Sequence, residues 1–202
     1  MYQRLEMKIP WEKDTKNQKQ KGGRSKTDPK DYAVWYRGIT GWLSGKDNIA
    51  IRILNLANMV MTAVVYVIYV VVLVDRALAG WQVSGIPGGL ECVLPYVLIP
   101  GISFVLVTIV RDKINEKRPY ETWDITPLIP KKTKGHSMPS RHIFSTTMIA
   151  MCVLSIDASM GVTLLLLCVF FSYVRVVGGV HYPRDVIAGY LIGVIWGLLL
   201  FL

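Results

Sequence analysis

Cysteines and metal-ligand clusters are scarce in this sequence. Its three cysteines, Cys92, Cys152 and Cys168, each lie in an apolar stretch, where cysteine usually serves as a small apolar side chain. Their positions indicate neither a disulfide framework nor a metal site. The chain also lacks a glycine-rich P-loop, zinc-type spacing of histidines and carboxylates, and any internal repeat. We therefore expect no metal and no cofactor.

Apolar residues dominate most of the chain beyond its N-terminal segment. Hydrophobic residues make up 52% of it and the mean hydropathy is +0.38, both high for a soluble protein. Residues 53–74 form a mostly apolar run without a charged residue, long enough to cross a hydrocarbon core, which needs roughly 20 helical residues. We predict an all-α polytopic membrane helical bundle of about five transmembrane helices. The candidate spans are residues 53–74, 92–110, 143–156, 162–177 and 186–202.

The N-terminal segment has a different character. Residues 13–31 offer almost no apolar side chain to bury, so we interpret residues 1–31 as a basic, disordered tail. Trp35, Tyr36, Ile39 and Trp42 then recur at helix-like spacing. We expect residues 32–48 to form an amphipathic helix at the membrane interface, with packing against the bundle as the alternative. Residues 49–202 would form the membrane domain.

The net charge of +9 would suit nucleic acid in a soluble protein, but here the basic residues lie in the segments between apolar spans. With five spans, 22 of the 23 Lys and Arg residues fall on one side of the membrane. Cytoplasmic loops carry such an excess of Lys and Arg, so this side is predicted to be cytoplasmic. We expect no nucleic-acid partner. We predict that the protein is integral to a cell membrane, and we interpret that membrane as bacterial.

Two of the three histidines lie beside charged residues at the ends of apolar spans. In RVVGGVHYPRD, His181 precedes Asp185 by four residues, so both can share one helical face. The carboxylate could then accept a hydrogen bond from one ring nitrogen and leave the other free as a nucleophile. Arg175 offers a guanidinium suited to phosphate oxygens, and Gly178 and Gly179 let backbone amides approach an anion. A purely structural His and Asp pair is the alternative.

The second histidine motif is PSRH. Ser140 is a candidate helix N-cap, which places His142 in the first turn of the next helix. Pro183 is a favoured first helical residue, so Asp185 also falls in a first turn. Helix N-termini attract anions, and two of them would meet at the histidines. His136 is interpreted as a loop residue.

The third motif, RDKINEKRP, follows the second span. Arg111 and Arg118 flank six residues that include Lys113 and Lys117, and Pro119 ends the helix. Several cations therefore lie at one membrane edge. They could bind phosphate, or they could only set the orientation of the chain and contact lipid headgroups.

Together the three motifs resemble the signature of the type 2 phosphatidic acid phosphatase and haloperoxidase superfamily. The family has Lys, six residues and Arg-Pro; then Pro-Ser-Gly-His; then Ser-Arg, five residues, His, three residues and Asp. In this chain Arg111 replaces the Lys and keeps its charge. Arg141 stands in place of the Gly, which leaves the local backbone geometry open, and Val174 stands in place of the Ser. The resemblance covers residues of about 50 to 202.

The resemblance implies a metal-independent phosphatase reaction. His181 would attack phosphorus, Asp185 would orient its ring, and His142 would protonate the leaving alkoxide and then activate water. Charge on the transferred group would be stabilised by Arg111, Arg118, Arg175, Ser140, Gly178 and Gly179. Secondary contacts are expected from Lys113, Lys117 and Arg141, the last of these to a second phosphate.

The substrate expected at a membrane edge is a lipid phosphate. Phosphatidic acid, phosphatidylglycerophosphate and undecaprenyl diphosphate remain open, as do the membrane side of the site and the oligomeric state. Three other functions use or imitate such a site. They are a lipid phosphotransferase, a vanadate-dependent haloperoxidase, and a non-catalytic membrane scaffold or transporter.

Overall fold

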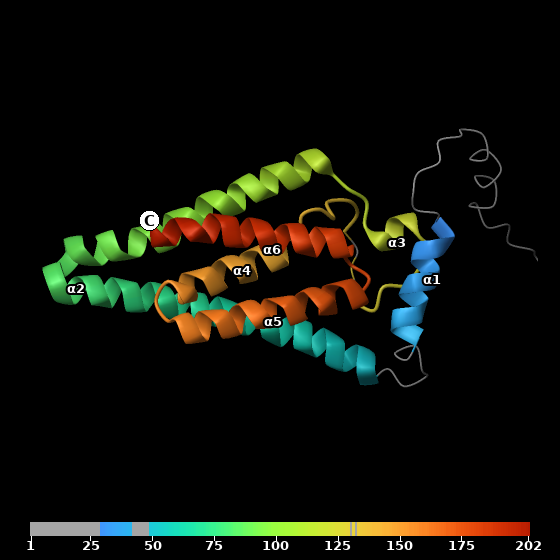
Figure 1. The fold of residues 1–202 in the computed structure, drawn as a ribbon, viewed down its shortest axis with the longest axis horizontal. Helices are drawn as coiled ribbons and strands as arrows, with labels where there is room; N and C mark the ends of the chain where they lie inside the picture. Colours follow the sequence, from blue (N-terminus) through green and yellow to red (C-terminus); the bar gives the residue numbers. More distant parts are fainter. Residues whose placement is uncertain (1–28, 42–48, 130, 132) are drawn as a thin grey trace, which may run out of the picture.

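The computed structural model describes residues 29–41, 49–129, 131 and 133–202, and this part of the chain is helical apart from its connecting loops (Figure 1). The fold is the predicted membrane helical bundle. α2, α4, α5 and α6 run along the long axis of the molecule, and α1 crosses one end. The elements are α1 (Pro29–Thr40), α2 (Ile49–Ile114), α3 (Pro119–Thr122), α4 (Arg141–Leu154), α5 (Ala158–Val177), α6 (Pro183–Gly197) and the final 3₁₀ turn η3 (Leu198–Phe201).

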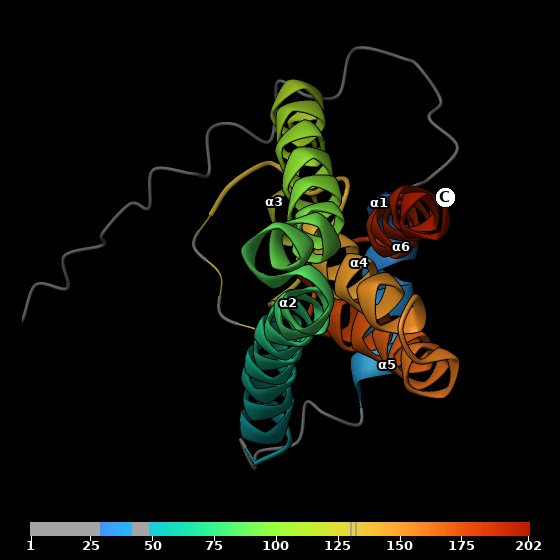
Figure 2. The same ribbon diagram turned by 90° about the vertical axis from the view of Figure 1, so that its left-hand side faces the viewer.

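α2 is a helical hairpin that contains the first two predicted spans. Its 66 residues are broken at Ser84 and Gly85, where Gly85 adopts a φ of 64°. The legs meet so closely that a Cβ on Gly80 would lie 2.0 Å from the carbonyl oxygen of Gly88. Viewed from this tip in Figure 2, the legs diverge toward the other end of the molecule. Both diverging legs pack against α4, since Val72 and Val107 share one apolar cluster with Phe144.

α4 is the shortest of the long-axis helices and the most enclosed. Its 14 residues span about 21 Å, less than the roughly 30 Å of a hydrocarbon core. By length and composition the candidate membrane spans are Ile51–Thr122, Ala158–Val177 and Pro183–Phe201, with α4 as a shorter apolar helix. Figure 1 shows α4 beginning short of the nearby ends of α5 and α6. Its N-terminus is therefore recessed within that end of the bundle.

Close packing of α6 against α4 brings the two helix starts together. Gly189, Gly193 and Gly197 face α4, and a Cβ at each would come within 2.4–2.8 Å of Ser140, Thr147 or Met151. Such small-residue faces allow membrane helices to approach closely. At the recessed end, the Ser140 amide donates to the Asp185 carbonyl oxygen at 2.9 Å. This contact joins the first turns of α4 and α6.

α1 packs across the same end, and its two faces differ in exposure. Tyr36 is 3% exposed, whereas Val34 is 65% exposed and Trp35 is 43% exposed. The helix thus packs against the bundle, as in the alternative stated above, and leaves Val34 and Trp35 on an exposed face. It begins at Pro29, inside the segment predicted to be disordered. Residues 1–28 and 42–48, with Trp42, lie outside the described residues, so the predictions made for them stay predictions.

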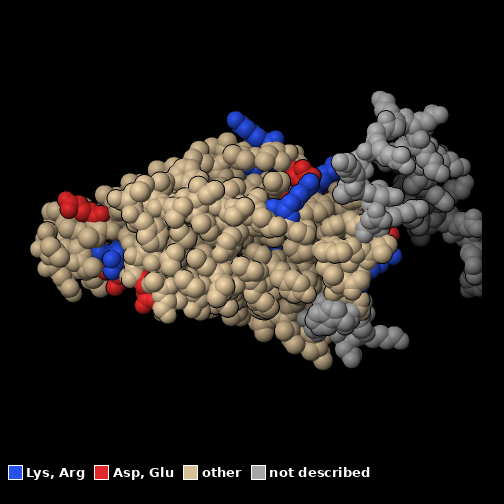
Figure 3. Space-filling model, viewed as in Figure 1, with Lys and Arg blue, Asp and Glu red and all other residues tan. Residues whose placement is uncertain are grey.

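Charged side chains on the face shown in Figure 3 gather toward the two ends of the molecule, with an uncharged belt between them. The hairpin end carries Asp75, Arg76, Glu91 and Asp157, whereas the opposite end carries the three basic motifs. This distribution is the one expected of a bundle whose middle faces lipid.

Candidate active site

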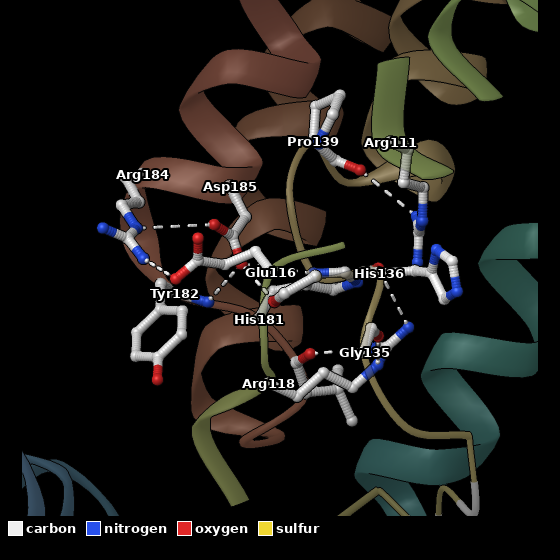
Figure 4. A network of polar contacts seen from close by, with 12 residues as sticks. Arg111, Glu116, Arg118, Gly135, His136, Pro139, His181, Tyr182, Arg184 and Asp185 are labelled. Atoms are coloured by element: carbon white, nitrogen blue, oxygen red, sulfur yellow. Dashed lines mark hydrogen bonds and ion pairs between the residues drawn. The ribbon is translucent and has the colours of Figure 1, made fainter. Parts of the chain in front are cut away.

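The three motifs meet at a cavity of about 190 Å³ at the recessed end of α4. Its lining includes five predicted residues, namely Arg111, Arg118, Arg141, His142 and His181. The loop before α4 adds Lys131, Thr133, Lys134, Gly135 and His136, and Asp112 of α2 completes the lining. Figure 4 shows how residues of this loop, the end of α2 and the start of α6 surround His181.

His181 and Asp185 lie together, but their contact differs from the predicted one. The distance from His181 Nδ1 to Asp185 Oδ2 is 3.6 Å, longer than a hydrogen bond. Oδ2 instead accepts hydrogen bonds from Ser137 Oγ and, at 3.0 Å, from the Tyr182 amide. His181 and Asp185 are both buried. Asp185 is thus held in a fixed orientation beside the ring.

Ser137 is a member of this site that the motifs did not reveal. It is fully buried, and its backbone amide also donates to the Glu116 carbonyl oxygen at 2.8 Å. Its contact with Asp185 joins residues 48 positions apart in the chain. Local spacing carries no signal for such a pair.

Burial of the His181 ring lowers its pKa well below the usual range, and the guanidinium groups of Arg175 and Arg118 act in the same direction. Asp185 opposes this shift. The imidazole is therefore neutral near pH 7, so one ring nitrogen has a lone pair available for attack.

Arg118 is a buried clamp as well as a cation. Its Nε donates to the Gly135 carbonyl oxygen and its Nη1 to that of Val180, both at 3.0 Å, and its Nη2 donates to that of His136 at 3.4 Å. Figure 4 shows these contacts joining the loop before α4 to the turn before His181. Two of its five N–H groups remain for other acceptors.

Arg175 and Ser140 carry buried polar atoms that have no hydrogen-bond partner among the described residues. Arg175 is 2% exposed and donates from Nη1 to Asn58 Oδ1 at 2.8 Å. Within the described part of the chain, its Nε and Nη2 have no hydrogen-bond partner, nor do Ser140 Oγ and Arg111 Nε. Buried donors without acceptors are unfavourable, so this cluster matches an anion with several oxygens. Asn58, in the first leg of α2, is a second residue that the motifs did not reveal.

Ser140 occupies the predicted N-cap position, but among the described residues its side chain makes no capping hydrogen bond. The buried hydroxyl therefore has no hydrogen-bond partner among the described residues. Arg111 reaches the same segment, because its Nη1 donates to the Pro139 carbonyl oxygen at 3.2 Å. The second motif is therefore held by the first motif on one side and by α6 on the other.

The two glycines predicted to contact phosphate are already engaged elsewhere. The Gly178 and Gly179 amides donate to the carbonyl oxygens of Val174 and Val176, both at 2.9 Å. Gly179 has a φ of 72°. A Cβ there would lie 2.6 Å from Tyr36 Oη. In this structure the two glycines shape the turn and its packing against α1. Their amides bind carbonyl oxygens of α5 and are not part of the cluster of unpartnered donors.

Lys113 and Lys117 are exposed outside the cavity, so the structure does not bring them to the site. Arg141, by contrast, lines its mouth, with the guanidinium 5.9 Å from the centre of the Phe104 ring. It is the first residue of α4 and has a helical backbone. An arginine at this position is therefore compatible with the local geometry.

Lys131 is a further cation that the motifs did not include. Burial, together with repulsion from Arg175, Arg118, Arg111 and Arg141, lowers its pKa to about 8. The crowded cations favour a polyanionic ligand, since an anion would relieve their mutual repulsion. Among the described residues, no three or more His, Cys, Asp or Glu side chains form a cluster that could hold a metal ion.

Comparisons with known proteins agree with this arrangement. Residues 92–202, more than half of the chain, match the family model of the PAP2 superfamily. The chain belongs to this superfamily. The matched region of this PAP2 protein contains all three motifs, whereas α1 and the first leg of α2 lie outside it.

One curated relative is an undecaprenyl-diphosphatase of Sulfolobus acidocaldarius. It is 34% identical over 107 residues, which cover 52% of this chain and 50% of the relative, so the match spans about half of that protein. Among solved structures, LpxE of Aquifex aeolicus superposes with a TM-score of 0.53 at 25% identity, over 78% of this chain and 95% of LpxE. A PAP2-type phosphatidylglycerolphosphate phosphatase of Bacillus subtilis shares the fold, with a TM-score of 0.50 at 19% identity over 86% and 94% of the two chains.

Proposed function

We propose that this protein is a metal-independent lipid phosphatase that acts through a phosphohistidine at His181. The cluster of buried, unpartnered N–H and O–H donors of Arg111, Arg175 and Ser140 supports this proposal most directly. Arg111 lines one cavity with His142 and His181, and Arg175 lies close enough to His181 to lower its pKa, so donors for a phosphoryl group, a nucleophile and a proton donor are near one another.

The reaction has two steps. In the first, a His181 ring nitrogen forms a bond to phosphorus while the bond from phosphorus to the leaving oxygen breaks, and His142 gives that oxygen a proton. In the second, water attacks the phosphohistidine, His142 takes a proton from the water, and inorganic phosphate leaves as His181 regains its lone pair. Asp185 stabilises the positive charge that the ring carries between the steps.

An apolar groove beside the site supports a lipid substrate. A cavity of about 260 Å³ lies between the α2 legs and α4, with Tyr66, Tyr69, Phe104 and Met148 in its lining. A smaller cavity shares Tyr66 and Ser145 with this groove and is also lined by His142. A phosphate at the histidines would thus have its hydrocarbon tail between the legs, in contact with membrane lipid.

The cations at the mouth favour a diphosphate over a monophosphate. We expect Arg141→Gly to lower kcat/KM for a prenyl diphosphate about tenfold and to change that for the matching monophosphate much less, since a charge-assisted contact to the second phosphate is lost. Inorganic phosphate release by purified protein from both lipids and from phosphatidic acid measures this. Lys113→Ala removes an exposed cation outside the cavity and serves as the control.

Equal losses on both lipids would contradict a role for Arg141 in recognising the second phosphate. Transfer of labelled phosphate to another lipid, with none released to water, would instead indicate a phosphotransferase. Wild-type protein that releases no phosphate from any lipid in the panel would contradict the proposed function itself.

We infer that the site faces the cytoplasm, because the end of the bundle that carries it holds the basic motifs, while the hairpin end is acidic on balance. In a background with Cys92, Cys152 and Cys168 replaced by alanine, we expect a cysteine at Glu91 to react with an impermeant maleimide in intact cells. A cysteine at Lys134 should react only after the cells are opened. The reverse pattern would place the site outside.

A further inference from the structure

The last turn of α5 and the turn that carries His181 are contacted by a helix that is remote in sequence. Tyr36 of α1 donates from its hydroxyl to the Val177 carbonyl oxygen at 3.0 Å, a buried hydrogen bond between residues 141 positions apart. Val177 is the last residue of the helix that presents Arg175. Because the helix ends there, no following helical turn supplies an N–H group to its carbonyl oxygen. This bond therefore fixes the start of the turn from Val177 to Tyr182.

The same tyrosine packs over the turn. Gly179 lies directly beneath the Tyr36 ring and hydroxyl, since an added Cβ would approach Oη to 2.6 Å and Cζ to 3.2 Å. Gly179 has a positive φ, so the close approach and the backbone conformation both require glycine here. Burial raises the pKa of Tyr36 to about 12, which keeps its hydroxyl a donor over the working pH range.

The other end of the turn is held by the aromatic neighbours of α1. The Tyr32 ring lies 5.2 Å from that of Tyr182 and 5.6 Å from that of Trp123, whose Nε1 donates to Tyr182 Oη at 2.9 Å. Tyr182 is the N-cap of α6, and its amide binds the carboxylate of Asp185. α1 thus contacts the turn on both sides of His181.

We propose that Tyr36 is a positioning residue for the reaction: by binding Val177 and covering Gly179, it holds the 177–182 turn so that His181 and Arg175 face the same phosphoryl group. The proposal rests on the proposed function for its catalytic consequence, but the ordering of the turn is independent of activity. It assigns to α1, which lies outside the matched family region, a direct part in the geometry of the site.

Tyr36→Phe tests the proposal, with Tyr32→Phe as the matched control. Both variants keep the ring, but the Tyr32 hydroxyl has no hydrogen-bond partner within the described residues, so its removal breaks no bond. In Tyr36→Phe we expect the amides of Gly178, Gly179 and Val180 to exchange with deuterium about fivefold faster, the change expected for loss of one hydrogen bond. We expect kcat to fall about five- to tenfold with KM little changed, and Tyr32→Phe to behave like wild type in both assays.

A second variant covers the case in which Tyr36→Phe retains the turn through packing alone. Gly179→Ala should accelerate the same exchange and lower kcat, and its effect should be smaller in the Tyr36→Phe background, because the colliding hydroxyl is gone. Unchanged exchange and kcat in Tyr36→Phe and additive effects in the double variant would overturn the proposal. Faster exchange in a protein whose wild type releases no phosphate would support the clamp on the turn and contradict the phosphatase.

Discussion

Replacing His181 by alanine is expected to lower inorganic phosphate release from lipid substrate by about 10⁴-fold or more, because the covalent route then has no nucleophile. Among the described residues lining the cavity, the remaining imidazoles are His136 and His142, and His142 already has its own role as acid and base. His136 has its Nδ1 3.1 Å from Asp112 Oδ1 and is a half-exposed loop residue. The measurement is phosphate release by purified protein in detergent or vesicles.

Two controls separate loss of chemistry from loss of fold. The first control is that His181→Ala keeps the wild-type melting temperature. It should also still bind inorganic phosphate, which would show that the Arg175 cluster is intact. Acid-quenched reactions with ³²P-labelled lipid should contain labelled protein for the wild type and none for His181→Ala. Full activity in His181→Ala, or a phosphoenzyme in that variant, would contradict the mechanism and leave the non-catalytic scaffold as the better interpretation.

The helix ends that form the site could be predicted because they depend on local signals. Apolar run lengths located the spans, and Pro183 placed Asp185 in the first turn of α6, as the structure has it. α4 begins at Arg141, so His142 falls in its first turn as predicted. These features depend on a few neighbouring residues, which is the range over which sequence patterns carry information.

The parts that sequence could not predict are contacts between remote segments. Ser137 reaches Asp185, Asn58 reaches Arg175 and Tyr36 reaches Val177 across 48, 117 and 141 positions. No local sequence pattern around either residue of these pairs indicates its partner. Asn58 had one weak signal, a polar amide within a long apolar run, where such groups tend to be functional.

Gly178 and Gly179 show a different limit. A pair of glycines is compatible with a backbone that binds an anion and with close packing of a neighbouring side chain. Each of these two arrangements requires a residue without a Cβ. The choice is made by Tyr36 and Ile129, which occupy the space over the pair, and by the carbonyl oxygens that engage its amides. Only the tertiary structure contains that information.

His142→Ala is expected to have an effect that depends on the leaving group. With a lipid phosphate, whose alkoxide leaves poorly without a proton, the rate should fall by about 10² to 10⁴-fold. With p-nitrophenyl phosphate, whose phenolate leaves unprotonated, formation of the phosphohistidine should fall by less than about tenfold. His142 is half-buried, lines the cavity with His181 and also borders the small cavity toward the apolar groove, where the leaving oxygen of a lipid would lie.

The second role of His142 gives the same variant a distinct signature. If it also activates water, His142→Ala should release one nitrophenolate per site in a rapid burst and then stall, with phosphohistidine accumulating on His181. The matched control is His181→Ala, which should show neither burst nor phosphoenzyme. Equal losses with both substrates and no burst would mean that His142 contributes to binding alone. The burst therefore distinguishes a general acid and base from a passive neighbour of the phosphate.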